Sequence, residues 1–379
     1  MDFDLTDEQR LLSDSTNRLL GDRYGFEARK GFRAGPEGWS RDMYAQFAEL
    51  GLLGLPFSEA DGGFGGGPVD TQLVMEAFGR SLVVEPYFAT IVLCGGLLRH
   101  LGSDEQRARL VPAIAAGETV LAYAQAERQS RYSLNDITTT ATHDGTGWRV
   151  TGEKSLVLHG DSADQLFVTA RTAGTHRERH GIGVFLVGAE TAGVTRRGYP
   201  TQDGLRAAEI SFNGASAEAL GDPGEALPAL EAVNDLALAA LCAEAVGVMQ
   251  AMHDLTIDYM KTRTQFGRPI GDNQALQHRA VDMYVSLEQA RSMALYATVM
   301  AADPDPVERT RALHAAKVQI GRSGRHIGQE AVQLHGGIGV TMEYVVGHHF
   351  KRITMIERLF GDTDSHLAAL ARLGGLIAA

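Results

Sequence analysis

Apolar residues recur at intervals of three and four through the first third of the chain, which is the spacing of amphipathic helices. The predicted helices cover residues 6–20, 41–50, 69–82, 89–101 and 103–117. Thr6 with Gln9 matches a capping box, and Ser103 begins the last of these helices as a cap. Residues 50–68 form an apolar turn and a glycine-rich run outside any strand–glycine–helix unit, so a flexible connection is predicted. We expect a helical domain at residues 1–118.

The pattern changes near Val120. Residues 135–212 are rich in Thr, Val and Gly, and Asp144 with Gly145 supplies turn chemistry between two extended runs, which predicts a β-hairpin. Further strands are predicted at residues 165–171, 181–187 and 207–212. Because no helical pattern separates these strands, we expect a small antiparallel sheet or barrel in a central domain at residues 119–222.

Helical periodicity returns at about residue 227 and continues to the end of the chain. It is interrupted at residues 263–272, 303–306, 336–340 and 361–363. Four or five long helices fit a helical bundle at residues 223–379. The predicted fold class is therefore α+β and mostly helical: a helical domain, a barrel-like antiparallel β domain and a four-helix bundle.

The first interruption in the bundle lies between a long helical segment at residues 227–262 and a second one that begins at Gln274. Gly267, Pro269 and Gly271 prevent one continuous helix. Proline lacks an N–H group, and glycine adopts backbone conformations that other residues avoid. The joint is a predicted helix hairpin.

This hairpin also has the ingredients of an anion site. Asp272 or Asn273 is expected to cap the second helix. A helix start has free N–H groups, and with Arg263 and Arg268 before it the stretch could bind a phosphate or pyrophosphate. An ordinary capped hairpin with surface arginines explains the same residues, and it is the better explanation if the stretch is taken alone.

Composition narrows the class of protein. The chain has 379 residues, 44% of them hydrophobic and 22% charged, as in globular proteins. Its net charge of −12 argues against a nucleic-acid binder. Cys94 and Cys242 are isolated in apolar helical contexts, which predicts buried, reduced thiols and a cytoplasmic location. The N-terminus is acidic and polar, unlike a targeting peptide, and no membrane span is expected.

The residue order RTQFGRPIGDNQALQHRAVDM at 263–283 resembles the helix hairpin of the acyl-CoA dehydrogenase family. The resemblance implies the three-domain fold described above, FAD as cofactor, an acyl-CoA substrate and electron-transfer flavoprotein as a partner. In that family the Arg, the residue two after it and the Phe reach the adenine-diphosphate half of a neighbouring subunit's FAD. The matching residues here are Arg263, Gln265 and Phe266, followed by Ile270, Asn273 and Gln274.

A second segment of the family is matched by QLHGGIG at 333–339. Taken alone, this run is explained equally well by a helix C-cap followed by a loop. In the family, however, the Gln and the glycine pair also contact the neighbour's FAD, which assigns Gln333, Gly336 and Gly337 to the same site. We call these nine residues of the two segments the FAD half-site.

The chain departs from the family where its own flavin ring would lie. Family members carry a Thr-Glu-Pro and then a Gly-Ser-Asp segment, but residues 123–132 here have Ala126 in place of the Thr and lack the Gly-Ser pair. A later Lys-x-Trp-Ile-Thr-Asn-Gly run is replaced by residues 154–160, with Leu156 and Leu158 at the Trp and Thr positions. The resemblance therefore implies the loss of an aromatic wall and of hydrogen-bond donors.

The catalytic base is also replaced. The family's reaction removes the α-proton of an acyl-CoA with a carboxylate in a dry pocket. Gly361 occupies the usual Glu position, and Ala237 occupies the alternative position on the preceding long helix. Asp362 and Glu244 are the remaining catalytic candidates. A helix cap is the simpler role for Asp362, and a structural hydrogen bond is the simpler role for Glu244.

The retained and lost residues together lead to a hypothesis of shared catalysis. The chain resembles the small subunits of heterotetrameric, pimeloyl-CoA dehydrogenase-like enzymes and the paired dehydrogenases of steroid side-chain breakdown. We expect a second acyl-CoA dehydrogenase subunit to hold the flavin ring and the base. The alternatives are a homotetramer that uses Asp362 or Glu244, a non-catalytic scaffold, and a flavin oxidase or monooxygenase of the same fold. No metal site is expected, because the histidines lack a compact ligand spacing.

Overall fold

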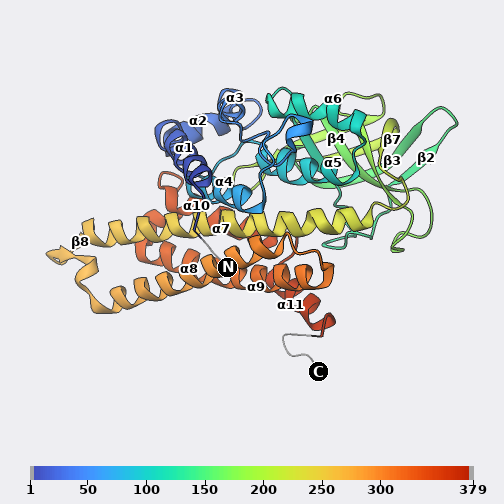
Figure 1. The fold of residues 1–379 in the computed structure, drawn as a ribbon. Helices are drawn as coiled ribbons and strands as arrows, with labels where there is room; N and C mark the ends of the chain where they lie inside the picture. Colours follow the sequence, from blue (N-terminus) through green and yellow to red (C-terminus); the bar gives the residue numbers. More distant parts are fainter. Residues whose placement is uncertain (1–3, 375–379) are drawn as a thin grey trace. The chain divides into compact units, whose positions relative to one another are not determined.

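The computed structural model describes residues 4–374 (Figure 1). These residues cluster into two compact units, each built from segments that are distant in the sequence. The first takes the described parts of Met1–Lys30, Pro68–Val83 and Leu238–Ala379, and the second takes Gly31–Gly67 and Val84–Ala237. The division of the sequence into domains at 1–118, 119–222 and 223–379 stays a prediction.

The first unit is helical. Its helices are α1 (Asp7–Arg23), α4 (Pro68–Ser81), α8 (Gln274–Met300), α9 (Pro306–His335), α10 (Val345–Arg358) and α11 (Thr363–Arg372). Along the chain, α2 (Phe26–Ala34) and α7 (Leu227–Thr262) belong partly to each unit. Helix α9 packs against α8, α10 and α11, and α1 packs against α4. The predicted capping box at Thr6 and Gln9 is present, and it fixes the start of α1.

The second unit combines short helices with a barrel. The helical elements are α3 (Arg41–Glu49), a 3-10 turn (Glu59–Asp61), a π-helical segment (Phe88–Cys94), α5 (Gly95–Leu101) and α6 (Asp104–Ala115). The strands are β1 (Leu121–Ala124), β2 (Thr140–His143), β3 (Trp148–Leu158), β4 (Gln165–Arg171), β5 (Ile182–Gly188), β6 (Val194–Pro200) and β7 (Arg206–Leu220). Strands β4, β2, β3, β7 and β5 form a closed ring, because β5 pairs both with β7 and with β4. The predicted barrel-like domain is confirmed.

Two strand pairings differ from the antiparallel expectation. Strand β1 pairs in parallel with β4, and β2 meets β4 in parallel at Thr140 and Arg171. Parallel neighbours cannot be joined by a tight hairpin, so their pairing is invisible in the local turn pattern. The sequence pattern also missed α2, β1 and β6. Strand β6 carries two arginines, a glycine and a proline on mostly exposed positions, which is a weak strand signal typical of an edge.

Helix α7 is long and apolar enough to cross a membrane by length and composition alone, whereas the sequence led us to expect no membrane span. However, 83% of its most apolar 18-residue window is buried within the protein. A core helix of a globular fold has the same composition, and the burial of α7 identifies it as one. The two cysteines are free thiols, buried as predicted.

Candidate functional site

The hairpin that joins α7 to α8 has a defined backbone. Two short strands, β8 (Thr264–Gln265) and β9 (Arg268–Pro269), pair antiparallel across a two-residue turn of Phe266 and Gly267. Both turn residues have positive φ, 53° at Phe266 and 82° at Gly267. The left-handed conformation costs a non-glycine residue about 1 kcal/mol. The Phe266 side chain is also fully exposed, at 102% relative accessibility, so the fold gains nothing from it within this chain.

The start of α8 corrects one prediction. Asn273 is the N-cap residue, but its side chain makes no capping hydrogen bond. Instead its Nδ2 donates to the carbonyl of Ile270 (2.9 Å), and its Oδ1 accepts from Arg268 Nη2 (3.0 Å). The Asn273 side chain is held back in the hairpin by these two bonds. The first N–H groups of α8 therefore have no side-chain cap.

The second segment of the half-site follows the end of α9. Gln333, Gly336 and Gly337 are exposed, and Gly336 has a φ of 65°. A Cβ atom built on Gly336 or Gly337 would have no atom within 4 Å. The backbone in front of these two glycines is open, and a bound group could approach it closely.

An aromatic stack brings the two segments of the half-site together. Tyr259, one helical turn before Arg263, stacks on His335 with ring centroids 4.5 Å apart and planes inclined by 28°. His335, two residues after Gln333, also lies 5.1 Å from the ring of Tyr344. Its Nδ1 is 2.8 Å from the carbonyl oxygen of Ala331, and burial lowers the pKa of the imidazole. The sequence gives no signal for this stack, because no spacing rule relates residues 76 positions apart.

Arg263 is exposed, and its side chain makes no hydrogen bond or ion pair with the residues that the structure describes. Its backbone is fixed: Arg263 N donates to Tyr259 O (2.8 Å), and Ile270 N donates to Arg263 O (2.9 Å). A fixed main chain with a free guanidinium suits the binding of an anion from outside the chain.

The position of the family's base is built for glycine. Gly361 has a φ of 119°, and a Cβ atom there would lie 2.6 Å from His366 Nε2 and 2.9 Å from Ser365 Oγ. The buried side chain of Lys317 holds the backbone turn at residues 356–361. Its ammonium group donates to the carbonyls of Ile356, Glu357, Leu359 and Gly361 at 2.9–3.2 Å. A side chain at position 361 would therefore require His366 or Ser365 to move.

Both remaining acids have structural partners. Asp362 is the N-cap of α11 and accepts from Ser365 N (2.9 Å), as predicted, and it also pairs with Arg358 (3.0 Å). Glu244 makes two bonds to Arg352, at 2.5 and 2.6 Å, and both side chains are only 6% exposed. The partner that a buried carboxylate at 244 requires is therefore Arg352 on α10.

The two segments that would face the flavin ring are tied to each other. Ser155 N donates to Ala126 O (2.8 Å), and the buried Lys154 ammonium lies 2.7 Å from Glu127 Oε1. Burial by itself would raise the pKa of Glu127. The charge of Lys154 and hydrogen bonds from Lys154, Thr138 and Gln129 outweigh burial and lower this pKa to about 2. Leu156 adopts a positive φ of 51° and is exposed.

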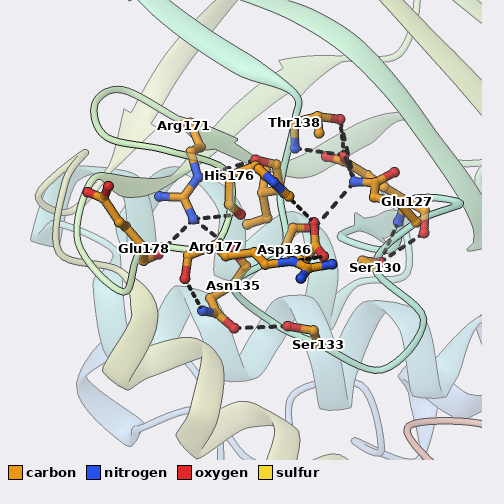
Figure 2. Close-up of polar contacts among 12 residues, drawn as sticks. Glu127, Ser130, Ser133, Asn135, Asp136, Thr138, Arg171, His176, Arg177 and Glu178 are labelled. Carbon is orange, nitrogen blue, oxygen red and sulfur yellow. Dashed lines mark hydrogen bonds and ion pairs between the residues drawn. The ribbon is translucent and has the colours of Figure 1, made fainter.

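Polar contacts fix the residues that follow Glu127 (Figure 2). The Arg171 guanidinium is buried and donates to the backbone carbonyls of Asn135, Ile137, His176, Glu178 and His180. Asp136 lies 2.9 Å from both His176 Nδ1 and Arg177 Nε. The polar groups of residues 127–138 thus form hydrogen bonds and ion pairs with loops of this chain, and the segment contains no Gly-Ser pair.

The histidines and acidic residues that the structure describes form no candidate metal site. No group of three His, Cys, Asp or Glu residues within 4–374 is placed to hold a metal ion. His348 and His349 are buried, and each has a ring nitrogen 3.1–3.2 Å from a backbone carbonyl oxygen. His314 and His366 lie with their Nδ1 atoms 2.7 Å apart. These histidines have packing roles.

The fold and the three-part order match one family of sequences. Residues 6–118 match the N-terminal domain of acyl-CoA dehydrogenases, residues 122–215 the middle domain and residues 235–374 the C-terminal domain. The chain is 27% identical over 380 residues to a probable acyl-CoA dehydrogenase, YngJ, of Bacillus subtilis, covering 98% of this chain and 99% of YngJ.

Two solved structures are similar over nearly the whole chain. A variant of the Tcur3481-Tcur3483 steroid ACAD matches with a TM-score of 0.87 and 29% identity, covering 97% of each chain. The ChsE4-ChsE5 complex from Mycobacterium tuberculosis matches with a TM-score of 0.87 and 25% identity, covering 98% of each chain.

The helical, barrel and helical order of the chain is the order of the N-terminal, middle and C-terminal domains of acyl-CoA dehydrogenases. The chain belongs to the acyl-CoA dehydrogenase family. It is accordingly classed as an oxidoreductase that acts on acyl-CoA, with FAD as its cofactor.

Proposed function

We propose that this chain is one subunit of a heteromeric acyl-CoA dehydrogenase and that it completes an FAD site on a partner subunit. The reaction is the α,β-dehydrogenation of an acyl-CoA thioester. The single observation that carries the proposal is the contrast between two places in the first unit: the half-site around Arg263 is exposed and fixed, whereas position 361 is packed for glycine.

The half-site residues suit the diphosphate end of FAD. The guanidinium of Arg263 supplies a positive charge with no competing partner among the described residues. Phe266 offers an exposed aromatic face for the adenine end, and Gly336 and Gly337 leave the backbone open. Gln265, Ile270, Asn273, Gln274 and Gln333 complete the proposed contacts. When bound, FAD accepts the hydride equivalent that leaves the β-carbon.

Proton removal needs a second group, and both candidate acids of the described residues, Asp362 and Glu244, already have structural partners. A general base must stand free and close to the α-proton. Asp362 caps a helix, and Glu244 is held by Arg352 through two charge-assisted bonds. The proposal therefore assigns the base, and the donors around the flavin ring, to the partner subunit.

The relatives support the assembly and the class of substrate. One similar structure is named as the ChsE4-ChsE5 complex, and another as the Tcur3481-Tcur3483 steroid ACAD. From these two structures we infer that this chain works in a hetero-oligomer and that its substrate is an acyl-CoA from fatty-acid or steroid degradation. Transfer of electrons to electron-transfer flavoprotein and a cytoplasmic location belong to the same proposal, and the buried free thiols suit a reducing compartment.

The test begins with purification of the chain alone and of the chain co-expressed with a second acyl-CoA dehydrogenase subunit from the same genome. Flavin absorbance and native mass are measured on both samples. The expected result is a colourless chain alone and a yellow complex with about one FAD per heterodimer. A yellow homotetramer that reduces its flavin with an acyl-CoA would overturn the proposal and return attention to Asp362 and Glu244.

Removal of the half-site charge refines this test. Arg263→Ala is expected to lower the FAD content of the complex, because a charge-assisted contact to the diphosphate is lost. Arg18→Ala is the matched control, since Arg18 is also an exposed helical-unit arginine but lies on α1. Unchanged flavin content and turnover in the Arg263 variant would contradict the half-site assignment.

A further inference from the structure

Three aromatic rings meet where the two segments of the half-site leave their helices. Tyr259 lies in the last turn of α7, His335 is the last residue of α9, and Tyr344 is the N-cap residue of α10. The centroid of the Tyr344 ring lies 5.1 Å from that of His335 and 6.4 Å from that of Tyr259. With the stack of Tyr259 on His335, all three pairs lie in the favourable range of about 4.5–7 Å. We call these three residues the ring cluster.

The ring cluster is joined to the half-site through the main chain. Arg263 N donates to Tyr259 O (2.8 Å), so the tyrosine and the arginine belong to one helical turn. His335 directly precedes Gly336, whose N–H donates to the carbonyl of Gln333. A shift of either ring would therefore move backbone that carries a half-site residue.

His335 is the central member of the cluster and bridges two helices. Its side chain is buried, with only 3% of the residue exposed. Burial lowers the pKa of the imidazole, and hydrogen bonding to the carbonyls of Ala331 on α9 and Leu255 on α7 opposes this effect. A Cβ atom built on Gly339 would lie 3.0 Å from His335 Cβ, so the 3-10 turn η4 (Gly336–Val340) packs directly on this side chain.

The surroundings of the ring cluster are partly open to solvent. Tyr259 and Tyr344 are half-buried, and the adjoining turn exposes Ile338 (41%) and Val340 (71%). An aromatic ring has only two side-chain torsions, so it fixes the adjoining backbone more narrowly than a flexible aliphatic side chain does. The cluster thus joins α7, α9 and α10 at the point where the half-site begins.

We propose that His335 is a positioning residue of the FAD half-site. Through Tyr259 and Tyr344 it holds the backbone of Arg263 and that of Gly336 in the relative placement at which both meet the FAD diphosphate. This inference rests on the proposed function. His335 acts through these neighbours and not by contact with the cofactor. A site whose parts are held in place before binding loses less ordering free energy when the ligand binds.

The experiment measures FAD affinity in the co-expressed complex. The complex is depleted of FAD and titrated with FAD, and the dissociation constant is read from flavin fluorescence. His335→Ala removes the central ring, whereas His335→Phe keeps a ring and removes its nitrogen atoms. His314→Ala is the matched control, because His314 lies on the same helix and its ring centroid is 4.9 Å from that of His366. Melting temperature and native mass check that each variant folds and assembles.

His335→Ala is expected to raise the FAD dissociation constant about tenfold, which corresponds to about 1.4 kcal/mol. His335→Phe is expected to restore most of the affinity, because the ring contacts with the two tyrosines remain. Turnover at saturating FAD is expected to change less than about twofold, since the proposed base lies on the partner subunit. His314→Ala is expected to leave the dissociation constant unchanged.

A double variant tests whether His335 acts through Arg263. In an Arg263→Ala background, His335→Ala is expected to raise the dissociation constant less than about threefold, because the relative placement of the two segments matters only while both bind. The full tenfold effect in both backgrounds would show that the two residues act independently, and it would overturn the assignment.

A second substitution covers the case in which His335→Ala does not fold. Tyr259→Leu removes the same stack from the side of α7, and a similar rise in the dissociation constant is expected. Unchanged FAD affinity in a folded His335→Ala or Tyr259→Leu complex would overturn the inference. Equal loss of affinity in His335→Ala and His314→Ala would also overturn it, since α9 as a whole would then have loosened.

The wild-type complex separates this inference from the proposed function. If the wild-type complex is yellow and loses FAD on Arg263→Ala, the proposed function stands whatever the His335 variants do. If the wild-type chains form no yellow complex, the proposed function itself fails, and the inference fails with it.

Discussion

The buried pair of Glu244 and Arg352 allows a structural role to be separated from a catalytic one. The two carboxylate oxygens lie 2.5 and 2.6 Å from Nε and Nη2 of the guanidinium, and each side chain is 6% exposed. Removing one partner of a buried ion pair leaves an uncompensated charge and costs about 3–5 kcal/mol. We expect about 3 kcal/mol for Glu244→Gln, which keeps one acceptor, and more for Glu244→Ala.

The double variant supplies the control. Glu244→Leu with Arg352→Met replaces both charges by apolar groups, and such replacement of a whole pair is often neutral. The double variant is therefore expected to be more stable than either single variant, with a coupling energy of about 2–3 kcal/mol in urea unfolding. Additive effects of the two single changes would show that the pair is not coupled.

Turnover of the heteromeric complex completes the assay. A structural pair predicts that Glu244→Gln and Arg352→Met lose activity only in proportion to the folded complex that is lost. If Glu244 were the base, Glu244→Gln would abolish turnover in a complex of normal stability, while Arg352→Met would keep part of it. A stability change below about 1 kcal/mol together with complete loss of turnover would refute the reasoning.

Two further predictions concern the buried polar groups of the site. The pKa of Glu127 is lowered to about 2, so its contribution to stability is fully present above its ordinary pKa and is lost as the pH falls through about 2. Between pH 5 and pH 2, the free energy of unfolding of the wild type is expected to fall by about 3 kcal/mol more than that of Glu127→Gln, as measured by urea titration at several pH values. An equal fall in the two proteins would contradict this prediction. Gly361→Ala is expected to destabilise the chain by about 2 kcal/mol, since its Cβ atom meets His366, whereas Gly337→Ala should be nearly neutral because its Cβ atom meets nothing within 4 Å. Equal melting temperatures for these two glycine variants would refute the packing argument.

The sequence by itself determined most of the elements and their order. The predicted limits 227–262 and the helix start at Gln274 agree with α7 and α8, because glycine and proline stop a helix through local backbone sterics. The capping box at Thr6 and the helix cap at Ser103 were predicted for the same reason, and the structure shows that Ser103 also forms a capping box, with Gln106. Each of these signals lies within a few residues of the element that it controls.

The FAD half-site was predicted from the resemblance to a family. The spacing of the residues alone favoured an ordinary capped hairpin. The roles of Arg263 and the other half-site residues stay predictions. What the structure contributes is their surroundings: an Arg263 side chain exposed to solvent and a backbone at Gly336 with nothing in front of it.

Only the tertiary structure decided which distant residues meet. Glu244 pairs with Arg352, which lies 108 positions further along the chain. The barrel closes because β5 pairs with both β4 and β7. The stack of Tyr259 on His335 and the hydrogen bond from Lys317 to the carbonyl of Gly361 are of the same kind. Hydrophobic periodicity and capping record the interactions of a residue with its near neighbours. The path of the chain through space chooses these long-range partners, and no local pattern encodes them.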